Sequence, residues 1–185
     1  MRIAFGLSSI TASRHESHAE LAAFLSEAQN VLWIGEAAEA YASFWSAELH
    51  EEYGSVIARI GIIVERHNAV PQFAIGPDGS LFAIGFNRCV AFIQGPPLHA
   101  QENMLNASFF NFIAKDEVLV AIHELGCTAF SSSTCDRKWE IDTDIVECAS
   151  LEGHWLSLKT SDGVIHRIDL FTGEDEESKK EKGPS

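Results

Sequence analysis

Three predicted β-hairpins recur along the chain at a fixed interval, and this interval constrains the fold more than any other feature. Their first strands begin at Leu81, Val118 and Trp155, so both steps are 37 residues long. Each hairpin has two short strands rich in apolar residues and a tight turn. Together they span 81–94, 118–131 and 155–171. A period of this size predicts a repeated β-unit.

The last part of the chain, residues 118–174, resembles one blade of a β-propeller of the PQQ or WD type. The resemblance rests on a few short motifs, namely Lys138-Trp139-Glu140, Asp162-Gly163, Ile168-Asp169-Leu170 and Thr172-Gly173. It covers less than a third of the chain. Four full blades would need nearly every residue, and the first 54 residues are not blade-like. The sequence therefore argues against a complete propeller and favours an antiparallel sheet, either strongly twisted or wrapped into a partial barrel.

The first third of the chain has helical signals. Ser13 and Glu16 have the spacing of a capping box, which predicts a helix from there to about Gln29. A short buried strand is expected over 31–34, and a second helix over 36–53 that ends at Gly54. Residues 101–114 are predicted to form a short apolar helix that covers one sheet face.

These elements predict an α+β fold in which an N-terminal helix and strand part packs on a predominantly antiparallel, hairpin-built sheet. We expect one domain over 1–173, with the helix and strand part over 1–54 and the β-hairpin part over 55–173. Residues 174–185 carry many charges and no apolar residue worth burying, which predicts a disordered tail.

Negative charge is concentrated among aromatic side chains near the N-terminus. Residues 15–58 contain eight Glu and no Lys or Arg. On the predicted second helix this stretch gives a partner-binding patch made of Tyr41, Phe44, Trp45, Glu48, Glu51 and Glu52. The alternative is that the aromatic side chains lie in the core and the glutamates form a solvated rim. Exposed aromatics ringed by charge are typical of residues that dominate binding energy.

The overall charge indicates what kind of partner to expect. The formal net charge is −14, and the last twelve residues account for little of it. Such a field repels nucleic acid and anionic membranes and attracts basic proteins. The four cysteines have no regular spacing, no secretory signal is evident, and no apolar run approaches the length of a membrane span. These features predict unpaired thiols and a cytoplasmic location.

One motif resembles a metal site. His123-Glu124 is followed by Cys127, where a zinc peptidase would have its second His on the same helical face. The flanking residues indicate strands, so the sequence favours a hairpin at this position and no cofactor. His15 and His18 are interpreted as polar helix residues. A second acidic run lacks the spacing of a calcium loop and consists of Asp136, Glu140, Asp142, Asp144 and Glu147.

No catalytic motif is convincing, so we do not expect an enzyme. The function that fits best is an acidic protein-binding inhibitor, of the type represented by an immunity protein that neutralises a basic bacterial toxin. Two alternatives stay open. One is a metal-dependent hydrolase that uses His123, Glu124 and nearby acids, and the other is a non-catalytic scaffold module.

Overall fold

The polypeptide folds into four separate β-sheets. The computed structural model describes residues 2–5, 8–35, 42–50, 54–65, 70–76, 81–94 and 97–176. Within these ranges the chain forms sixteen strands and one helix. The α+β prediction is therefore wrong, because nearly all of the regular structure is strand. The predicted single twisted sheet is also wrong, since the strands divide into four hydrogen-bonded groups.

Sheet A is formed by the N-terminal part of the chain. Its strand order is β1-β2-β4-β5-β3, and β3 runs parallel to β5 while the other pairs are antiparallel. The single described helix, α1 (His18–Ser26), connects β2 to β3. The strands of sheet A are β1 (Arg2–Phe5), β2 (Ser8–His15), β3 (Val31–Ile34), β4 (Ser43–His50) and β5 (Val56–Val64).

Sheets B, C and D are antiparallel meanders in which successive strands pair in chain order. Sheet B consists of β6 (Gln72–Ile75), β7 (Phe82–Phe86), β8 (Cys89–Gln94) and β9 (His99–Met104). Sheet C consists of β10 (Phe109–Lys115), β11 (Val118–His123), β12 (Gly126–Ser131) and β13 (Arg137–Asp142). Sheet D consists of β14 (Val146–Glu152), β15 (Trp155–Thr160) and β16 (Ile165–Asp169). The three predicted hairpins are confirmed as β7–β8, β11–β12 and β15–β16.

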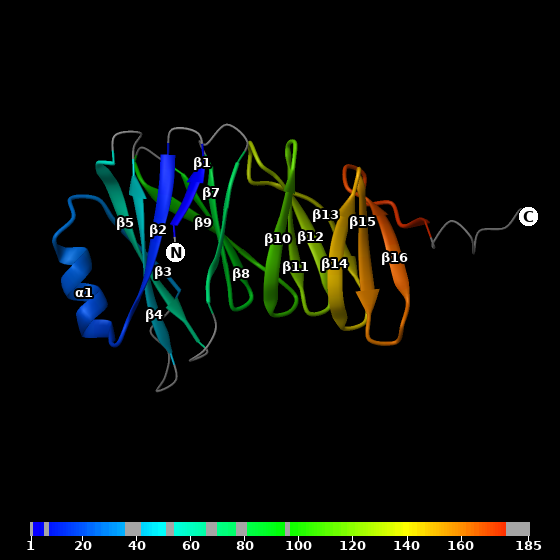
Figure 1. Ribbon diagram of the computed structural model, residues 1–185, viewed down its shortest axis with the longest axis horizontal. Coiled ribbons are helices and arrows are strands. Elements are labelled where there is room, and N and C mark those ends of the chain that lie inside the picture. Colours follow the sequence, from blue (N-terminus) through cyan, green and yellow to red (C-terminus); the bar gives the residue numbers. More distant parts are fainter. Residues whose placement is uncertain are drawn as a thin grey trace, which may run out of the picture.

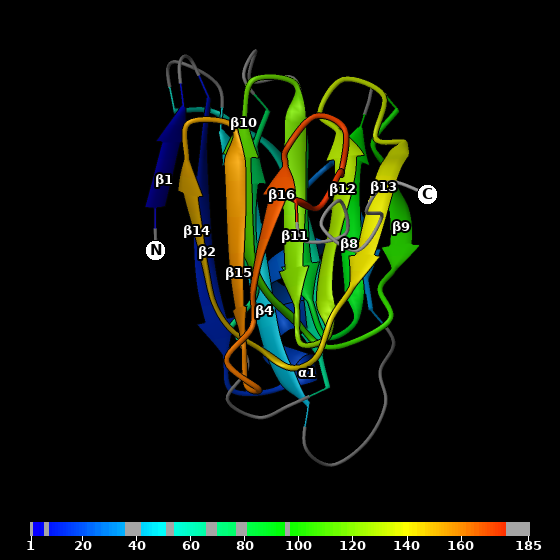
Figure 2. The same ribbon diagram turned by 90° about the vertical axis from the view of Figure 1, so that its right-hand side faces the viewer.

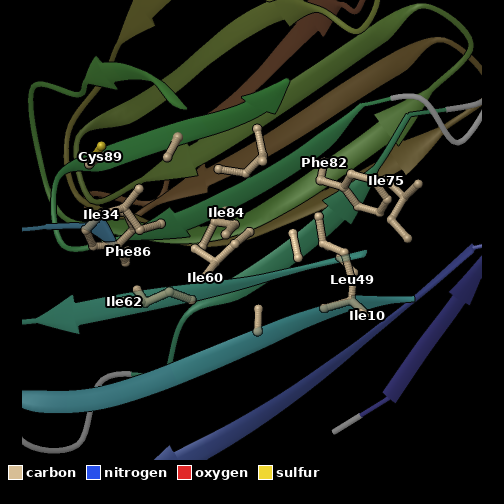
Figure 3. Close-up of a cluster of buried hydrophobic side chains, with 14 of the residues drawn as sticks. Ile10, Ile34, Leu49, Ile60, Ile62, Ile75, Phe82, Ile84, Phe86 and Cys89 are labelled. Carbon is tan, nitrogen blue, oxygen red and sulfur yellow. The ribbon is translucent and has the colours of Figure 1, made fainter. Parts of the chain in front are cut away.

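The four sheets follow one another along the longest axis of the molecule (Figure 1). A view along that axis shows the sheets one behind another, so that neighbouring sheets are stacked face to face (Figure 2). One hydrophobic cluster fills each of the three gaps between neighbouring sheets. In the first gap, Ile60 and Ile62 of sheet A meet Ile84 and Phe86 of sheet B (Figure 3). Apolar residues on both faces of β8 and β11 are buried, because sheets B and C each have a neighbour on either side.

The outer face of sheet A is covered by α1. Its N-cap is Ser17, whose side chain accepts a hydrogen bond from the backbone N–H of Glu20, while Glu20 accepts one from the backbone N–H of Glu16. The helix thus begins four residues later than predicted, since Ser13 belongs to β2. Leu21 and Leu25 are buried beneath it. A Cβ at Gly61 would lie 2.6 Å from Leu25, so glycine allows the helix to approach the sheet closely.

Two predicted helices are strands instead. The described part of 36–53 is β4, where residues alternate between the core and the face beneath α1. Residues 101–114 form the end of β9 and most of β10. Both stretches are stabilised by strand partners distant in sequence, which outweigh local helical preference.

Candidate functional site

Tight turns and sheet-to-sheet connections gather at one end of the stack, the lower edge in Figure 1. We call this the turn end and define it by residues 87–88, 105–108, 124–125, 143–145 and 161–163. It forms because the hairpin turns of sheets B, C and D follow strands that run in the same direction. The end therefore unites segments spread over more than seventy residues of sequence.

Hydrogen bonds link the turn end from sheet to sheet. The side chain of Asn87 accepts from the backbone N–H of Glu65 at 3.0 Å, and its carbonyl accepts from Phe109 at 2.6 Å. Farther along, the carbonyl of Ser108 accepts from the N–H of Glu124 at 2.9 Å. The carbonyl of Glu124 in turn accepts from Val146 at 2.8 Å. These bonds fix the positions of the connecting segments before any ligand arrives.

Exposed apolar side chains lie on this fixed end. Leu125 is 40% exposed and Ile145 is 46% exposed, and the two segments that carry them are joined because the carbonyl of Leu125 accepts from the N–H of Thr143 at 2.9 Å. Phe110 and Ile165 are also exposed, on strands that begin at the turn end. Exposed apolar side chains that lie together on a surface are typical of protein contact sites.

The charges around these apolar residues are mainly negative. Asp142, Asp144 and Asp162 are exposed, and Glu124 is half-buried. Hydrogen bonds from the Thr160 hydroxyl and the Val164 backbone lower the pKa of Asp162 below its ordinary value, so this carboxylate stays charged. The nearby cation, Arg88, donates to the carbonyls of Leu105 and Asn106.

The predicted partner-binding patch is only partly described. Tyr41, Glu51 and Glu52 lie outside the described residues. Phe44 is half-buried beneath α1, where its ring centre is 5.9 Å from that of His18. Trp45 points to the opposite face and packs against the core between sheets A and B. Glu48 forms an ion pair with Arg59, so the structure does not bring these three side chains together on one surface.

The residues of the alternative metal site are also separated. His123 faces sheet B and is completely buried, whereas Cys127 lies in the core between sheets C and D. The two residues are not opposite each other in the β11–β12 hairpin, because His123 pairs with Gly126 and Cys127 pairs with Ile122. Burial raises the pKa of the Cys127 thiol to about 12. No cluster of three potential metal ligands occurs in the part of the chain that the structure describes.

In the second acidic run, Glu140 and Asp142 share one hydrogen-bond donor, and Glu147 has a different partner. Glu140 forms an ion pair with Arg137 at 2.7 Å, and Glu147 forms one with Lys159 at 2.9 Å. The side-chain amide of Asn106 donates to Glu140 at 2.9 Å and to Asp142 at 3.2 Å. Asp136 and Asp144 are exposed. These contacts stabilise the edge of sheet C and the connection to sheet D.

A serine, a histidine and a glutamate meet under α1. His15 Nε2 lies 2.8 Å from Ser46 Oγ, and its Nδ1 lies 3.6 Å from Glu20 Oε1. The order of groups resembles that of a catalytic triad. Ser46, however, is 1% exposed, so a substrate cannot reach its hydroxyl. These contacts stabilise the packing of α1 on sheet A, because Glu20 belongs to α1 and the other two residues belong to β2 and β4. His18, the other member of the predicted polar pair, stacks on Trp33.

Two further observations concern cellular context. All four cysteines are free, and only Cys148 is exposed. No helix within the described ranges has the length and apolarity needed to cross a membrane.

The comparisons with known proteins concern the fold. No known family model matches the sequence, and no curated protein matches it. Among solved structures the chain is similar to BamB from Moraxella catarrhalis, with 14% identity and a TM-score of 0.51 over 90% of this chain and 50% of that one. It is also similar to the N-terminal domain of Nup159, with 10% identity and a TM-score of 0.50 over 72% and 40% of the two chains.

A third similar structure is the computationally designed protein Ika8, with 12% identity and a TM-score of 0.50 over 75% and 46% of the two chains. BamB and Nup159 are β-propeller proteins, which confirms the blade resemblance seen in the sequence. The chain spans half or less of each of these three proteins. At these identities the likeness shows a shared fold, in which the sheets resemble successive propeller blades.

Proposed function

We propose that this chain is a non-catalytic protein-binding module and that its partner docks on the turn end with a basic surface. The observation that carries the proposal is the exposure of Leu125 and Ile145 on hydrogen-bonded turns. Asp142 and Asp144 precede Ile145 in the chain, and the segment that carries Asp162 is joined to Ile145 by the hydrogen bond from the Ser161 N–H to the Ile145 carbonyl. Apolar anchors supply most of the energy of a typical interface, and surrounding charge increases the rate of association.

The β-propeller neighbours support a scaffold role at the level of the fold. Neutralisation of a basic toxin is a narrower form of the same proposal, and it stays a prediction. A hydrolase centred on His123, Glu124 and Cys127 has less support, because the first and last of these side chains lie on opposite faces of sheet C.

Quantitative capture from a lysate of the native host tests the proposal. The immobilised parent chain is compared with a Leu125→Ser/Ile145→Ser variant and with an Asp142→Lys/Asp144→Lys variant. Ile57→Ser and Glu117→Lys are matched controls, since both residues are exposed at the opposite end of the stack. We expect a basic protein that the parent and both controls retain and that both turn-end variants lose.

The two turn-end variants should also differ in kinetics once that protein is purified. Loss of the apolar anchors should mainly speed dissociation, whereas charge reversal should mainly slow association at low salt. Equal retention by all variants, after matching circular dichroism spectra have shown that they fold, would contradict the proposal.

A further inference from the structure

A small cavity opens between sheets B and C at the end of the stack opposite the turn end. Its volume is about 280 Å³, and it exists because small residues line the gap between the two sheets. Ala74, Ala83 and Ala114 take part in the lining together with Gly76. Deeper in the same gap, Phe92 and Phe130 fill the space with their rings 5.1 Å apart. The cavity is therefore a local deficit of side-chain volume in a layer that is packed elsewhere.

The cavity wall is mainly apolar and includes one hydroxyl group. Leu81, Val118 and Leu119 are buried residues that line it. Ser132 lines it too and is only 7% exposed. Its backbone N–H donates to the carbonyl of Glu117, but its hydroxyl has no hydrogen-bond partner in the described part of the chain. The hydroxyl is accessible to solvent, and a ligand in the cavity would hydrogen-bond to it in place of water.

The mouth of the cavity carries a carboxylate. Asp116 is exposed in the β10–β11 turn and forms no ion pair with any described residue. The neighbouring cation, Lys115, donates a hydrogen bond from its ammonium to the carbonyl of Gly153. The strongly acidic chain adds a general preference for cations. Charge and shape together select a ligand with an apolar ring at one end and a positive charge at the other.

We infer that this cavity binds a small arylalkylamine, with the ring between sheets B and C and the ammonium beside Asp116. The volume matches a single ring system about the size of an indole side chain. A ring N–H would donate to the Ser132 hydroxyl. The inference is independent of the proposed function, because it concerns the opposite end of the stack and requires no protein partner.

Titration calorimetry with three probes tests the inference. Tryptamine has the ring and an ammonium, indole has the ring alone, and indole-3-acetate has the ring and a negative charge. For ligands of this size we expect a Kd for tryptamine of about 1 mM. Tryptamine should bind about threefold more tightly than indole, as is typical of an exposed charge pair, and indole-3-acetate should bind most weakly.

Variants then assign each contact. Asp116→Asn should lower the affinity for tryptamine to that for indole. Glu117→Gln changes the adjacent exposed acid and should leave the difference in affinity between the two ligands unchanged. Ser132→Ala should weaken both ring ligands by a factor of about 3 to 10, whereas Ser133→Ala at an exposed neighbour should not. Ala83→Leu should fill the cavity and abolish binding, and Ala74→Leu serves the same purpose if the first variant fails to fold.

Three results would overturn the inference. The first is an absence of tryptamine binding to the parent chain at 10 mM, about ten times the expected Kd. The second is binding to a folded Ala83→Leu or Ala74→Leu variant with the affinity of the parent. The third is an unchanged preference for tryptamine over indole in Asp116→Asn.

Discussion

Phe44 and Trp45 are neighbours in β4, and their side chains lie on opposite faces of sheet A. The ring of Phe44 meets His18 of α1, while Trp45 packs against the cluster between sheets A and B. A helix would have placed both rings on one side. The strand divides them, so one surface cannot use both as binding anchors.

Trp45→Ala should therefore lower the free energy of unfolding, by about 2–3 kcal/mol. Phe44→Ala should cost less, because Phe44 contributes to the helix contact and not to the cluster between the sheets. Urea unfolding followed by far-UV circular dichroism measures both. A Trp45→Ala variant as stable as the parent but unable to bind its partner would restore the predicted patch.

Arg59 links α1 to β4, and replacing it should loosen that link. Its Nε donates to Glu48 at 2.9 Å, its Nη1 donates to the carbonyl of Phe24, and its guanidinium lies 4.0 Å from the centre of the Phe24 ring. The single ammonium of a lysine cannot make all three of these contacts at once, so Arg59→Lys should lower the free energy of unfolding by about 1–2 kcal/mol.

Arg167→Lys is the matched control for that change. Arg167 also lies over an aromatic ring, that of Trp155, and pairs with a carboxylate, that of Glu176, but its side chain is about half exposed. The control should therefore cost less than 1 kcal/mol. Equal costs in urea unfolding would show that Arg59 does not hold the helix.

Gly85 and Phe109 make a close contact between sheets B and C. A Cβ at Gly85 would lie 2.2 Å from the Phe109 ring, closer than packed atoms approach. Gly85→Ala should lower the free energy of unfolding by about 1–3 kcal/mol. In a chain that already carries Phe109→Ala, Gly85→Ala should leave the free energy of unfolding almost unchanged. Thermal or urea unfolding of the two single variants and the double variant tests this. An equal cost of Gly85→Ala in both backgrounds would mean that the Phe109 ring is not the source of the destabilisation.

His123 should make the fold sensitive to acid. Burial lowers its pKa, outweighing the carboxylates of Glu140 and Asp142, so the folded protein keeps this imidazole neutral. The unfolded chain binds the proton near pH 6.5. The stabilisation is present above that pH and is lost as the pH falls towards the lowered folded value.

Urea unfolding from pH 8 to pH 5 measures this effect. The parent should lose more stability on acidification than His123→Gln, in which the titrating group is gone. His99→Gln, at an exposed residue, should follow the parent. Parallel curves for all three proteins would contradict the assignment.

Some of this structure follows from local sequence and some does not. The β11–β12 and β15–β16 hairpins were predictable, because their strands and turns lie within twenty residues of each other. Three of the four blade motifs also meet, since Trp139 Nε1 donates to the carbonyl of Leu170 at 3.2 Å and Gly173 packs on the same ring. Strand β4 was not predictable from its own residues. The partners that make it a strand are β2 and β5, and the charge of Glu48 is balanced by Arg59.

The turn end was missed for a related reason. Leu125 and Ile145 are ordinary turn residues in sequence, and they become a surface only when several connections lie side by side. A signal was present in the constant spacing of the hairpins. Turns that recur at one interval in a stack of like units fall at the same end, so 87–88, 124–125 and 161–163 could have been grouped before the structure was known.

The stack of sheets also determines where the molecule should open first. Sheets that bury a core on both sides lose two interfaces if they unfold, whereas a terminal sheet loses one. Sheet A has one neighbouring sheet but is held on its other side by α1, Arg59 and Leu25. Within the described residues, sheet D has three strands and one neighbouring sheet. Local unfolding should therefore begin in sheet D and reach the inner sheets only afterwards. Backbone amide hydrogens should accordingly exchange with solvent fastest in β14 to β16 and slowest in β8.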